Sequence, residues 1–221
     1  MKRVLITGGS RGIGKAIVKK FQSEGYEVIA PERQELSLDN SLSIQNYIEK
    51  HNNEIFDVIV NNAGCNDINL IENITDEEID TMISVNLIAP IKIVRGFVRG
   101  MKSQEYGRII NIGSIWASVS KAGRCVYSAT KNGVHGVTNT LAVELAPYNI
   151  LVNTVCPGFT LTELTKKNNT PEQIAEITKS IPAGRMAEPE EMAEIVYFLA
   201  SEKNTYLTGQ KITVDGGFTE Q

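Results

Sequence analysis

The chain has 221 residues, of which 42% are hydrophobic and 22% are charged, a balance typical of a folded globular protein that excludes a disordered one. Twenty-two Lys and Arg residues face 26 Asp and Glu residues, so the net charge is −4 and no concentrated basic surface for nucleic acid is expected. The first apolar run has four residues, and no later run reaches the ~20 of a membrane helix, which predicts a cytoplasmic protein with no membrane partner.

Short apolar, β-branched segments recur along the chain at strand length, with longer segments of helical character between them. They are Val4–Thr7, Glu27–Ala30, Phe56–Val60, Arg108–Ile112, Leu151–Val155 and Lys211–Val214. This alternation predicts an α/β fold, a doubly wound parallel sheet of the Rossmann type covered by helices on both faces. The length allows one domain or two, and because no repeat or Pro/Ser-rich linker divides the chain, we expect residues 1–221 to form a single domain.

Three helices have clear boundaries in the sequence. Gly14–Ser23 is amphipathic and ends at Gly25. Thr75 and the acidic residues after it have the pattern of a capping box, which predicts a helix from there to about Leu87. Pro189 and the two glutamates after it begin another.

A Gly-rich turn joins the first strand to the first helix, with Gly8, Gly12 and Gly14 at its corners. Glycines let a phosphate approach the backbone, and a helix N-terminus attracts its charge, so a nucleotide is the expected ligand. The turn also matches the start of a Walker A motif, but Ala16 stands where that motif needs Ser or Thr. A P-loop NTPase is therefore the weaker alternative.

The chain has three cysteines, Cys65, Cys125 and Cys156, in no paired spacing, and only two histidines. We expect reduced thiols in or near the core and no metal site.

Further motifs follow the Gly-rich turn in a fixed order. They are TGGSRGIG at 7–14, NNAG at 61–64, Asn86 within SVNL, Ser114 within NIGS, YSATK at 127–131, PGF at 157–159 with Thr162, and TGQKITVDGG near the end. With these the sequence resembles the short-chain dehydrogenase/reductase family over essentially its whole length, and its C-terminal half is most similar to 3-oxoacyl-carrier-protein reductases. The resemblance implies an NAD(P)(H)-dependent oxidoreductase that interconverts a carbonyl and a secondary alcohol.

The residue types suit that reaction. A ketone that accepts hydride needs a proton donor at its oxygen, and Tyr127 is the expected donor. Lys131, one helical turn later, is expected to lower the pKa of Tyr127, and Ser114 to stabilise the substrate oxygen. By the resemblance, Asn86 holds a water that links Lys131 to a proton relay. A catalytically quiet nucleotide-sensing protein on the same fold is the alternative.

The resemblance also implies a set of cofactor-binding residues. They are Gly8, Ser10, Arg11, Gly12, Ile13, Gly14, Glu32, Arg33, Ser37, Leu38, Asn62, Ala63, Gly64, Tyr127, Lys131, Pro157, Gly158, Thr160 and Thr162. Glu32 favours NAD, because a carboxylate binds the ribose hydroxyls, whereas Arg33 and Arg11 favour the 2′-phosphate of NADP. Two cations against one carboxylate give a slight preference for NADP.

The residues expected to border the substrate follow the catalytic motifs. They are Cys65, Asn66, Ile115, Trp116, Phe159, Leu161 and Leu164, and in relatives a region that corresponds to residues 160–185 folds over the substrate as a lid. Lys121 and Arg124 would suit an anionic substrate, but we interpret them as an exposed, solvated pair. A 3-oxoacyl thioester is the leading substrate, although Glu105 and Tyr148 stand where carrier-protein reductases have basic residues.

Members of the family usually have about 250 residues and form dimers or tetramers, so the resemblance implies a homodimer or homotetramer. The 221 residues here are fewer, and Glu35–Leu38 follows the second strand closely. We therefore predict that the helix between the second and third strands is missing and replaced by an extended connection. Ser37 or Asp39 would then contact adenine.

Overall fold

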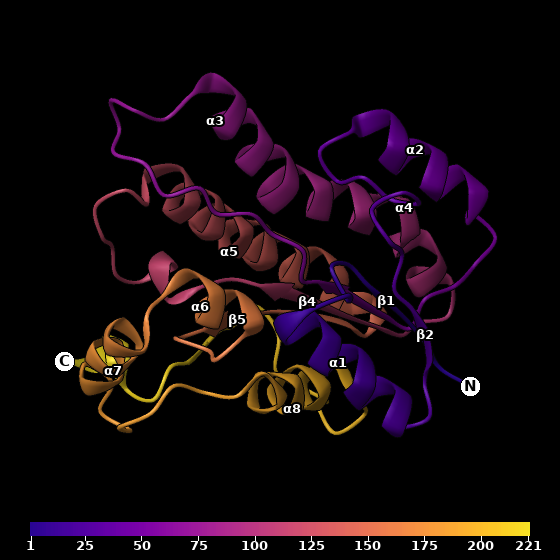
Figure 1. Ribbon diagram of the computed structural model, residues 1–221. Helices are drawn as coiled ribbons and strands as arrows, with labels where there is room; N and C mark the ends of the chain where they lie inside the picture. The colour runs from indigo at the N-terminus through magenta and orange to yellow at the C-terminus, as the bar shows by residue number, and fades with distance from the viewer.

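The computed structural model (Figure 1) describes the backbone of residues 1–221 and every side chain except those of Leu164 and Asn168. Six parallel strands form one sheet in the order β2-β1-β3-β4-β5-β6. Their bounds are β1 Arg3–Ile6, β2 Glu27–Ile29, β3 Val58–Asn61, β4 Gly107–Ile112, β5 Ile150–Pro157 and β6 Lys211–Val214. β3, β4 and β5 are buried along their whole length, as befits strands covered on both faces. The predicted doubly wound parallel sheet is confirmed.

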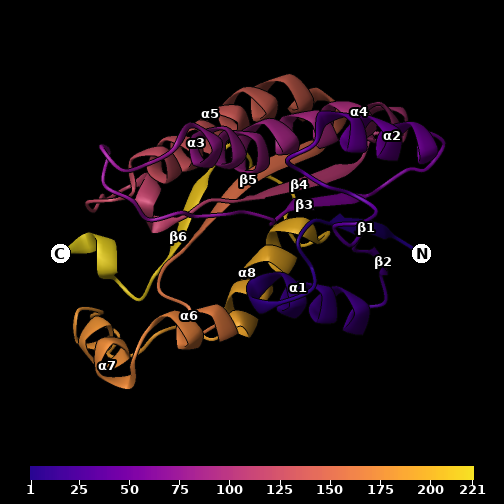
Figure 2. The same ribbon diagram turned by 45° about the horizontal axis from the view of Figure 1, so that its top comes forward.

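Helices pack on both faces of the sheet (Figure 2). α1 (Gly12–Ser23) and α8 (Pro189–Ala200) lie on one face; α2 (Ser41–Lys50), α4 (Ala89–Ser103) and α5 (Cys125–Leu145) lie on the other. The strands alternate between the two cores: the side chains of Val4 and Ile6 pack with α1 and α8, while Leu5 between them packs with α2, α4 and α5.

The chain changes direction across the sheet at β1. From β1 it passes outward to β2, and it then returns to β3 on the other side of β1. In parallel sheets such a reversal opens a crevice beyond the carboxyl ends of the strands, where ligands bind. The ends of β1 and β3 therefore frame the ligand site.

The prediction that the helix between the second and third strands is missing is wrong. α2 lies in this connection, and Asn40 caps it by accepting hydrogen bonds from two backbone N–H groups at 2.9 and 3.1 Å. A crossover between parallel strands usually uses a helix, because the helix buries its apolar side on the sheet. The described backbone of residues 31–36 forms turns and no helix, and Glu35–Leu38 adds no strand.

The helix predicted from Thr75 begins as expected but does not end near Leu87. Thr75 accepts a hydrogen bond from the N–H of Glu78 at 3.2 Å, and the Glu78 carboxylate accepts one from the N–H of Thr75 at 2.8 Å. α3 (Asp76–Ile83) then passes through a π-helical turn, Ser84–Ile88, directly into α4. Such turns are frequent at functional sites.

By length and composition alone, the helical run 76–103 would suit a membrane span. The run still contains no uninterrupted apolar stretch of ~20 residues, because Asn86, Lys92 and Arg95 lie within it. Its apolar side is used inside the protein, since Ile93, Phe97 and Met101 of α4 are buried in the core beside the sheet.

The segment predicted as a lid contains two short helices, α6 (Glu163–Asn168) and α7 (Pro171–Lys179). Both ends of the segment are anchored. Thr160 forms a parallel bridge with Ala187, and Arg185 makes two contacts of 2.6 and 2.7 Å with the Glu191 carboxylate of α8. The Arg185 guanidinium lowers the pKa of Glu191 to about 2.

The three cysteines are free thiols. Cys156 is buried and Cys65 is half-buried, but Cys125 is exposed in the first turn of α5, so its predicted place near the core is wrong. Burial raises the pKa of Cys156 and of Cys65. Among the described residues no three His, Cys, Asp or Glu side chains are grouped to hold a metal.

Candidate active site

The Gly-rich turn after β1 has the shape and the free backbone groups that a pyrophosphate requires. Gly8 has a φ of +67°, and a Cβ on Gly14 would collide with the carbonyl oxygen of Gly8. α1 begins at Gly12, and its N-cap residue Arg11 makes no side-chain hydrogen bond to the first-turn N–H groups. These N–H groups can therefore donate to phosphate oxygens, so this part of the chain fits a dinucleotide.

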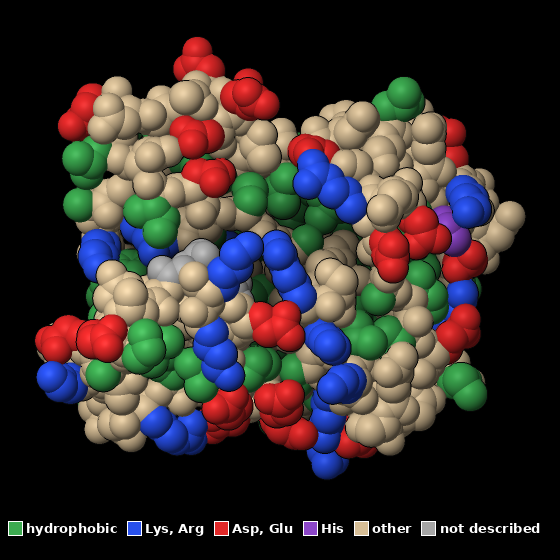
Figure 3. Space-filling model, in the orientation of Figure 1, with side chains coloured by type: hydrophobic (Ala, Val, Ile, Leu, Met, Phe, Trp, Pro, Cys, Tyr) green, Lys and Arg blue, Asp and Glu red, His purple; other side chains and the backbone are tan. Residues whose placement is uncertain are grey.

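The face with this turn has both signs of charge. Figure 3 shows Lys and Arg side chains across the middle of the face, with Asp and Glu side chains among them. Lys20 of α1, for example, contacts the carboxylates of Glu24 and Glu194 at 2.8 Å each. The exposed Arg11 and Ser10 lie at the turn itself, while Ile13 packs partly on the core.

Asn62, the second Asn of NNAG, holds the Gly-rich turn in place. Its Nδ2 donates to the carbonyl oxygens of Thr7 and Gly8 at 3.0 and 2.9 Å. In return, the Thr7 hydroxyl oxygen accepts hydrogen bonds from the N–H groups of Asn62 and Ala63, both at 3.1 Å. The Asn62 amide is thus directed at the turn, and Thr7, the first residue of the TGGSRGIG motif, joins the turn to the NNAG loop.

Lys131 and Tyr127 stand one turn apart on α5, as predicted. Lys131 is 4% exposed, and its ammonium donates to the carbonyl oxygen of Ile112 at the end of β4 at 2.7 Å. The Lys131 Nζ lies 5.6 Å from the centre of the Tyr127 ring. A Cβ built on Gly64 would be 3.6 Å from the same Nζ, so the NNAG loop lies beside this cation. A buried charge thus stands beside a half-buried phenol.

Ser114 follows β4 and begins a short 3₁₀ turn, Ile115–Ala117. Its Oγ accepts a hydrogen bond from the N–H of Trp116 at 3.2 Å, and the residue is 6% exposed. This bond uses a lone pair and not the hydroxyl hydrogen, so the O–H is able to donate to a substrate oxygen. Ile115 was expected to border the substrate, but it is only 2% exposed and packs inside the protein.

Asn86 lies in the π-helical turn and joins the loops around the catalytic residues. Its Oδ1 accepts a hydrogen bond from the N–H of Cys65 at 2.9 Å, and its Nδ2 donates to the Cys65 carbonyl at 2.9 Å and to Thr130 Oγ1 at 3.2 Å. Thr130 Oγ1 in turn donates to the carbonyl oxygen of Tyr127 at 2.8 Å. The side chain of Asn86 is therefore engaged in positioning the NNAG loop and α5. Sequence reasoning did not find Thr130.

The segment after β5 reaches the Gly-rich turn. Thr162 caps α6, and its methyl carbon would be 3.3 Å from a Cβ built on Gly12. Thr160 is buried, and its hydroxyl donates to the carbonyl oxygen of Gly158 at 3.2 Å. Pro157 ends β5. The residues predicted for the nicotinamide end are thus brought to the same crevice as the phosphate turn.

The residues predicted for the adenosine end lie in the connection after β2. Arg33 is 80% exposed and its guanidinium contacts the Asp39 carboxylate at 2.6 Å. Ser37 Oγ donates to the other Asp39 oxygen at 2.5 Å, and this bond, with the charge of Arg33, lowers the pKa of Asp39. Glu32 is exposed, while Leu38 packs partly on the core.

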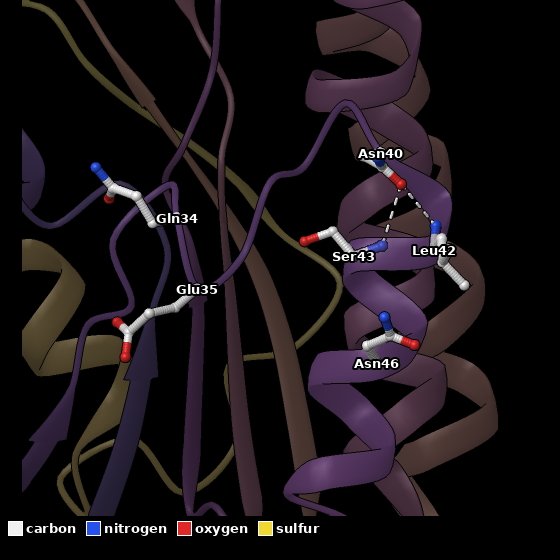
Figure 4. A pocket seen from close by; sticks show the side chains of 6 residues that line it. All are labelled: Gln34, Glu35, Asn40, Leu42, Ser43 and Asn46. Atoms are coloured by element: carbon white, nitrogen blue, oxygen red, sulfur yellow. Dashed lines mark hydrogen bonds between the residues drawn. The ribbon is translucent and has the colours of Figure 1, made fainter.

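A shallow polar cleft lies between this connection and the first turns of α2 (Figure 4). It has a volume of about 300 Å³ and is lined by Gln34, Glu35, Asn40, Leu42, Ser43 and Asn46. The Asn40 oxygen already caps α2. The cleft lies beside the edge strand β2, so it is separate from the catalytic side chains.

An aromatic wall, formed by Trp116, Phe159 and Phe218, lies next to Ser114. The Trp116 and Phe159 rings meet edge to face with centroids 6.2 Å apart, and Phe159 meets Phe218 in the same way at 5.1 Å. The guanidinium carbon of Arg124 lies 5.3 Å from the centre of the Trp116 ring. Arg124 is half-buried, so its interpretation as part of an exposed pair is wrong. Leu164 lies outside the described side chains.

Comparison with known proteins agrees with this geometry. A family model described as short chain dehydrogenase matches residues 2–51, and one described as Enoyl-(Acyl carrier protein) reductase matches residues 39–219. The 3-oxoacyl-[acyl-carrier-protein] reductase FabG of Vibrio cholerae is 36% identical over 236 residues, covering 98% of this chain and 96% of that protein. This chain belongs to the short-chain dehydrogenase/reductase family.

Solved structures of this family superpose on the whole chain. A protein assigned as an NAD(P)-dependent gluconate 5-dehydrogenase of Beutenbergia cavernae, with NADP bound, has a TM-score of 0.94 and 30% identity and covers 100% of this chain and 97% of its own. A 4-hydroxyisoleucine dehydrogenase complexed with NADH has a TM-score of 0.95 and 26% identity, with full coverage of both chains. The short-chain dehydrogenase described here is an NAD(P)-dependent oxidoreductase that interconverts carbonyl and alcohol groups and acts on a small molecule.

Proposed function

We propose that Tyr127, Ser114 and Lys131 carry out this interconversion. In the direction of reduction, Tyr127 gives its phenolic proton to the oxygen of a ketone while Ser114 donates a hydrogen bond to that oxygen. A bound nicotinamide dinucleotide supplies or accepts the hydride at the carbon. The observation that carries this proposal is the position of the Lys131 ammonium, which is buried, donates to the Ile112 carbonyl at 2.7 Å and lies 5.6 Å from the centre of the Tyr127 ring.

Asn86 acts in this proposal as a positioning residue. Its side chain bonds to Cys65 and Thr130, and Asn86 is also proposed, as the resemblance implies, to hold the water that links Lys131 to a proton relay. The residues proposed to hold the pyrophosphate are Gly8, Ser10, Arg11, Gly12, Ile13 and Gly14. Pro157, Gly158, Thr160 and Thr162 would hold the carboxamide, and Lys131 the ribose next to it. Ala63 and Gly64 would line the adenosine side with their backbone.

NADP is the proposed coenzyme, with NAD as the alternative. Arg33 and Arg11 are both exposed cations on the coenzyme side, and they outweigh the single carboxylate of Glu32. Because Asp39 already contacts Arg33, a 2′-phosphate would compete with the Asp39 carboxylate for the guanidinium. Comparison of kcat/KM for NADPH and NADH tests the proposal, and a clear preference for NADH would contradict it.

A 3-oxoacyl thioester is the first substrate to test, because the curated relatives are named for that reaction. The absence of basic residues at Glu105 and Tyr148 argues against a carrier protein as the acyl carrier. The solved relatives are named for gluconate and 4-hydroxyisoleucine, which are small hydroxy acids. All of these substrates present a ketone or a secondary alcohol to the same three side chains.

Three further proposals concern the whole molecule. Residues 1–221 act as one domain, with 160–185 as a substrate lid that meets the Gly-rich turn at Thr162.

Copies of the chain form a homodimer or homotetramer in the cytoplasm, without nucleic acid or membrane. The apolar side chains of Ile83, Ile88 and Ile91 on the helices around Asn86 support this assembly, because each is more than a third exposed. Light scattering of the purified protein would measure its mass.

The decisive test of the proposed roles is Tyr127→Phe. We expect turnover in a coenzyme-oxidation assay over ketones, sugars and acyl thioesters to fall about 10²–10⁴-fold, because the proton donor is lost. Coenzyme binding, measured by fluorescence, is expected to stay within a few-fold. Tyr206→Phe is the matched control, since Tyr206 is 94% exposed. Full turnover by the Tyr127 variant on a true substrate would refute the proposed role.

A further inference from the structure

Arg124 is the exception among the arginines that are not exposed to solvent. Arg3 pairs with the carboxylates of Glu27 and Glu54, and the buried Arg108 donates to three backbone carbonyls. In the part of the chain whose side chains are described, the Arg124 guanidinium has neither a carboxylate nor a carbonyl partner. The Nε atoms of both Arg108 and Arg124 are buried without a hydrogen-bond acceptor, but the two terminal nitrogens of Arg108 have carbonyl partners, whereas among the described residues those of Arg124 have none. Such an unsatisfied group costs stability, which suggests that an acceptor arrives with a ligand.

The place of Arg124 ties it to the reacting groups. It precedes α5 directly, three residues before Tyr127, and its guanidinium lies over the Trp116 ring. The backbone N–H of Trp116 donates a hydrogen bond to Ser114 Oγ at 3.2 Å. Trp116 therefore contacts both Ser114, the residue proposed to hold the substrate oxygen, and the guanidinium of Arg124.

The electrostatic surroundings of Arg124 favour an anion. Burial lowers the pKa of Arg124, and the one opposing charge effect comes from Tyr127, not from an acidic side chain. The guanidinium lies against the aromatic wall, and a charge next to apolar groups attracts a ligand charge more strongly than a charge in water does. The flat guanidinium forms two parallel hydrogen bonds with a carboxylate, and Lys cannot reproduce this geometry.

We propose that Arg124 binds the carboxylate of the substrate and thereby selects small hydroxy and oxo acids over neutral ketones and thioesters. This inference rests on the proposed function, because it assumes that the reacting oxygen is held by Ser114 and Tyr127. The acid group would lie over the edge of Trp116 while the ketone lies between Ser114 and Tyr127. The Arg124 guanidinium is then a specificity determinant and takes no part in proton transfer.

The kinetic test compares an oxo acid with its uncharged methyl ester. We expect wild-type protein to reduce acetoacetate with a kcat/KM at least tenfold above that for methyl acetoacetate. Arg124→Met, which keeps an apolar side chain against Trp116, should lose about 10–100-fold with acetoacetate, mainly through KM, and change less than threefold with the ester. Arg124→Lys should be intermediate. Lys121→Met is the matched control, since Lys121 is an exposed cation on the same loop, and should change neither substrate more than twofold.

A binding measurement makes the test independent of turnover. Trp116 is the only tryptophan in the chain, so a carboxylate on Arg124 should change the protein's fluorescence when acetoacetate is added to the NADP⁺ complex. We expect a saturable change in the wild type and in Tyr127→Phe, and none in Arg124→Met. Absence of that change in the wild type, or equal losses on acid and ester in Arg124→Met, would overturn the inference. Reduction of ester and thioester through Tyr127 without preference for the acid would overturn it and leave the proposed function standing.

Discussion

The two ends of the coenzyme crevice are built in different ways. At the catalytic end, Lys131, Asn86 and Ser114 are 1–6% exposed. Lys131 donates to a carbonyl of β4, Asn86 bonds to the NNAG loop and to α5, and Ser114 accepts a hydrogen bond within its own turn. At the adenosine end, Arg33 is 80% exposed and held by the single carboxylate of Asp39. Proton transfer needs atoms fixed to within a fraction of an ångström, whereas an exposed ion pair can exchange one partner for another.

This difference predicts which property of the enzyme a substitution at each end will change. Substitutions at the catalytic end should reduce turnover and also stability, because they break buried hydrogen bonds. Substitutions at the adenosine end should change coenzyme preference while the protein keeps its fold. The predictions below test that division.

The largest effect is expected for Lys131→Met. Loss of the ammonium beside Tyr127 removes the buried positive charge next to the proposed proton donor, so kcat should fall about 10²–10⁴-fold. The Ile112 carbonyl also loses its donor, which should lower the free energy of unfolding by about 1–3 kcal/mol. Steady-state kinetics and urea unfolding measure the two effects. Lys50→Met, at the exposed end of α2, is the control. A Lys131 variant with normal turnover would contradict the proposal that turnover depends on the buried catalytic end.

The Gly-rich turn lies between the two ends, and Gly14→Ala tests it. The new methyl group would collide with the Gly8 carbonyl and the Asn62 amide, so the turn cannot keep its shape. Coenzyme affinity should fall at least about tenfold, and unfolding free energy by about 1–3 kcal/mol, as for other overpacked sites. Gly136→Ala is the matched control within α5, because a Cβ there meets nothing within 4 Å. It should be neutral or stabilising, and calorimetry of coenzyme binding checks both variants.

Much of the catalytic end could be predicted from the sequence, because its residues follow strands or stand one helical turn apart. Ser114 after β4, and Tyr127 and Lys131 on α5, lie where the motif spacing implies. What could not be predicted are contacts between distant segments. The bonds of Asn86 reach residues 21 and 44 positions away, and the half-buried Arg124 lies over the Trp116 ring, eight positions earlier in the chain.

The adenosine end was harder to predict for a different reason. α2 has few apolar residues, and only Ile44 and Tyr47 of it are buried, so its hydrophobic pattern is weak. Its N-cap Asn40 was the one available local signal. The closeness of Glu35–Leu38 to β2 led to the prediction of an extended connection without a helix, but the helix follows five residues after Leu36, at Ser41. Edge segments take their structure from packing more than from their own sequence.

A smaller effect is expected for Arg33→Ala, which removes the exposed cation of the adenosine end. If Arg33 binds the 2′-phosphate, the KM for NADPH should rise about tenfold, while the KM for NADH stays within twofold. Stability should change by less than about 1 kcal/mol, because the Arg33–Asp39 pair is exposed. Equal changes in KM for both coenzymes would indicate that Arg33 does not bind the 2′-phosphate. A large loss of stability would contradict the proposed difference from the catalytic end.

The smallest effect is expected for Asp39→Asn, which frees the Arg33 guanidinium. The KM for NADPH should fall two- to threefold, because the phosphate no longer competes with a carboxylate for Arg33. Since Ser37 and Arg33 depress the pKa of Asp39, the ionised carboxylate stabilises the fold at pH values above the unfolded pKa of about 3.9, and this contribution is lost as the pH falls through the lower folded value. The wild type should therefore be slightly more stable than Asp39→Asn at pH 7, and the difference should shrink below pH 4. Thermal unfolding at both pH values measures it, and a difference that grows on acidification would show that the carboxylate does not stabilise this connection.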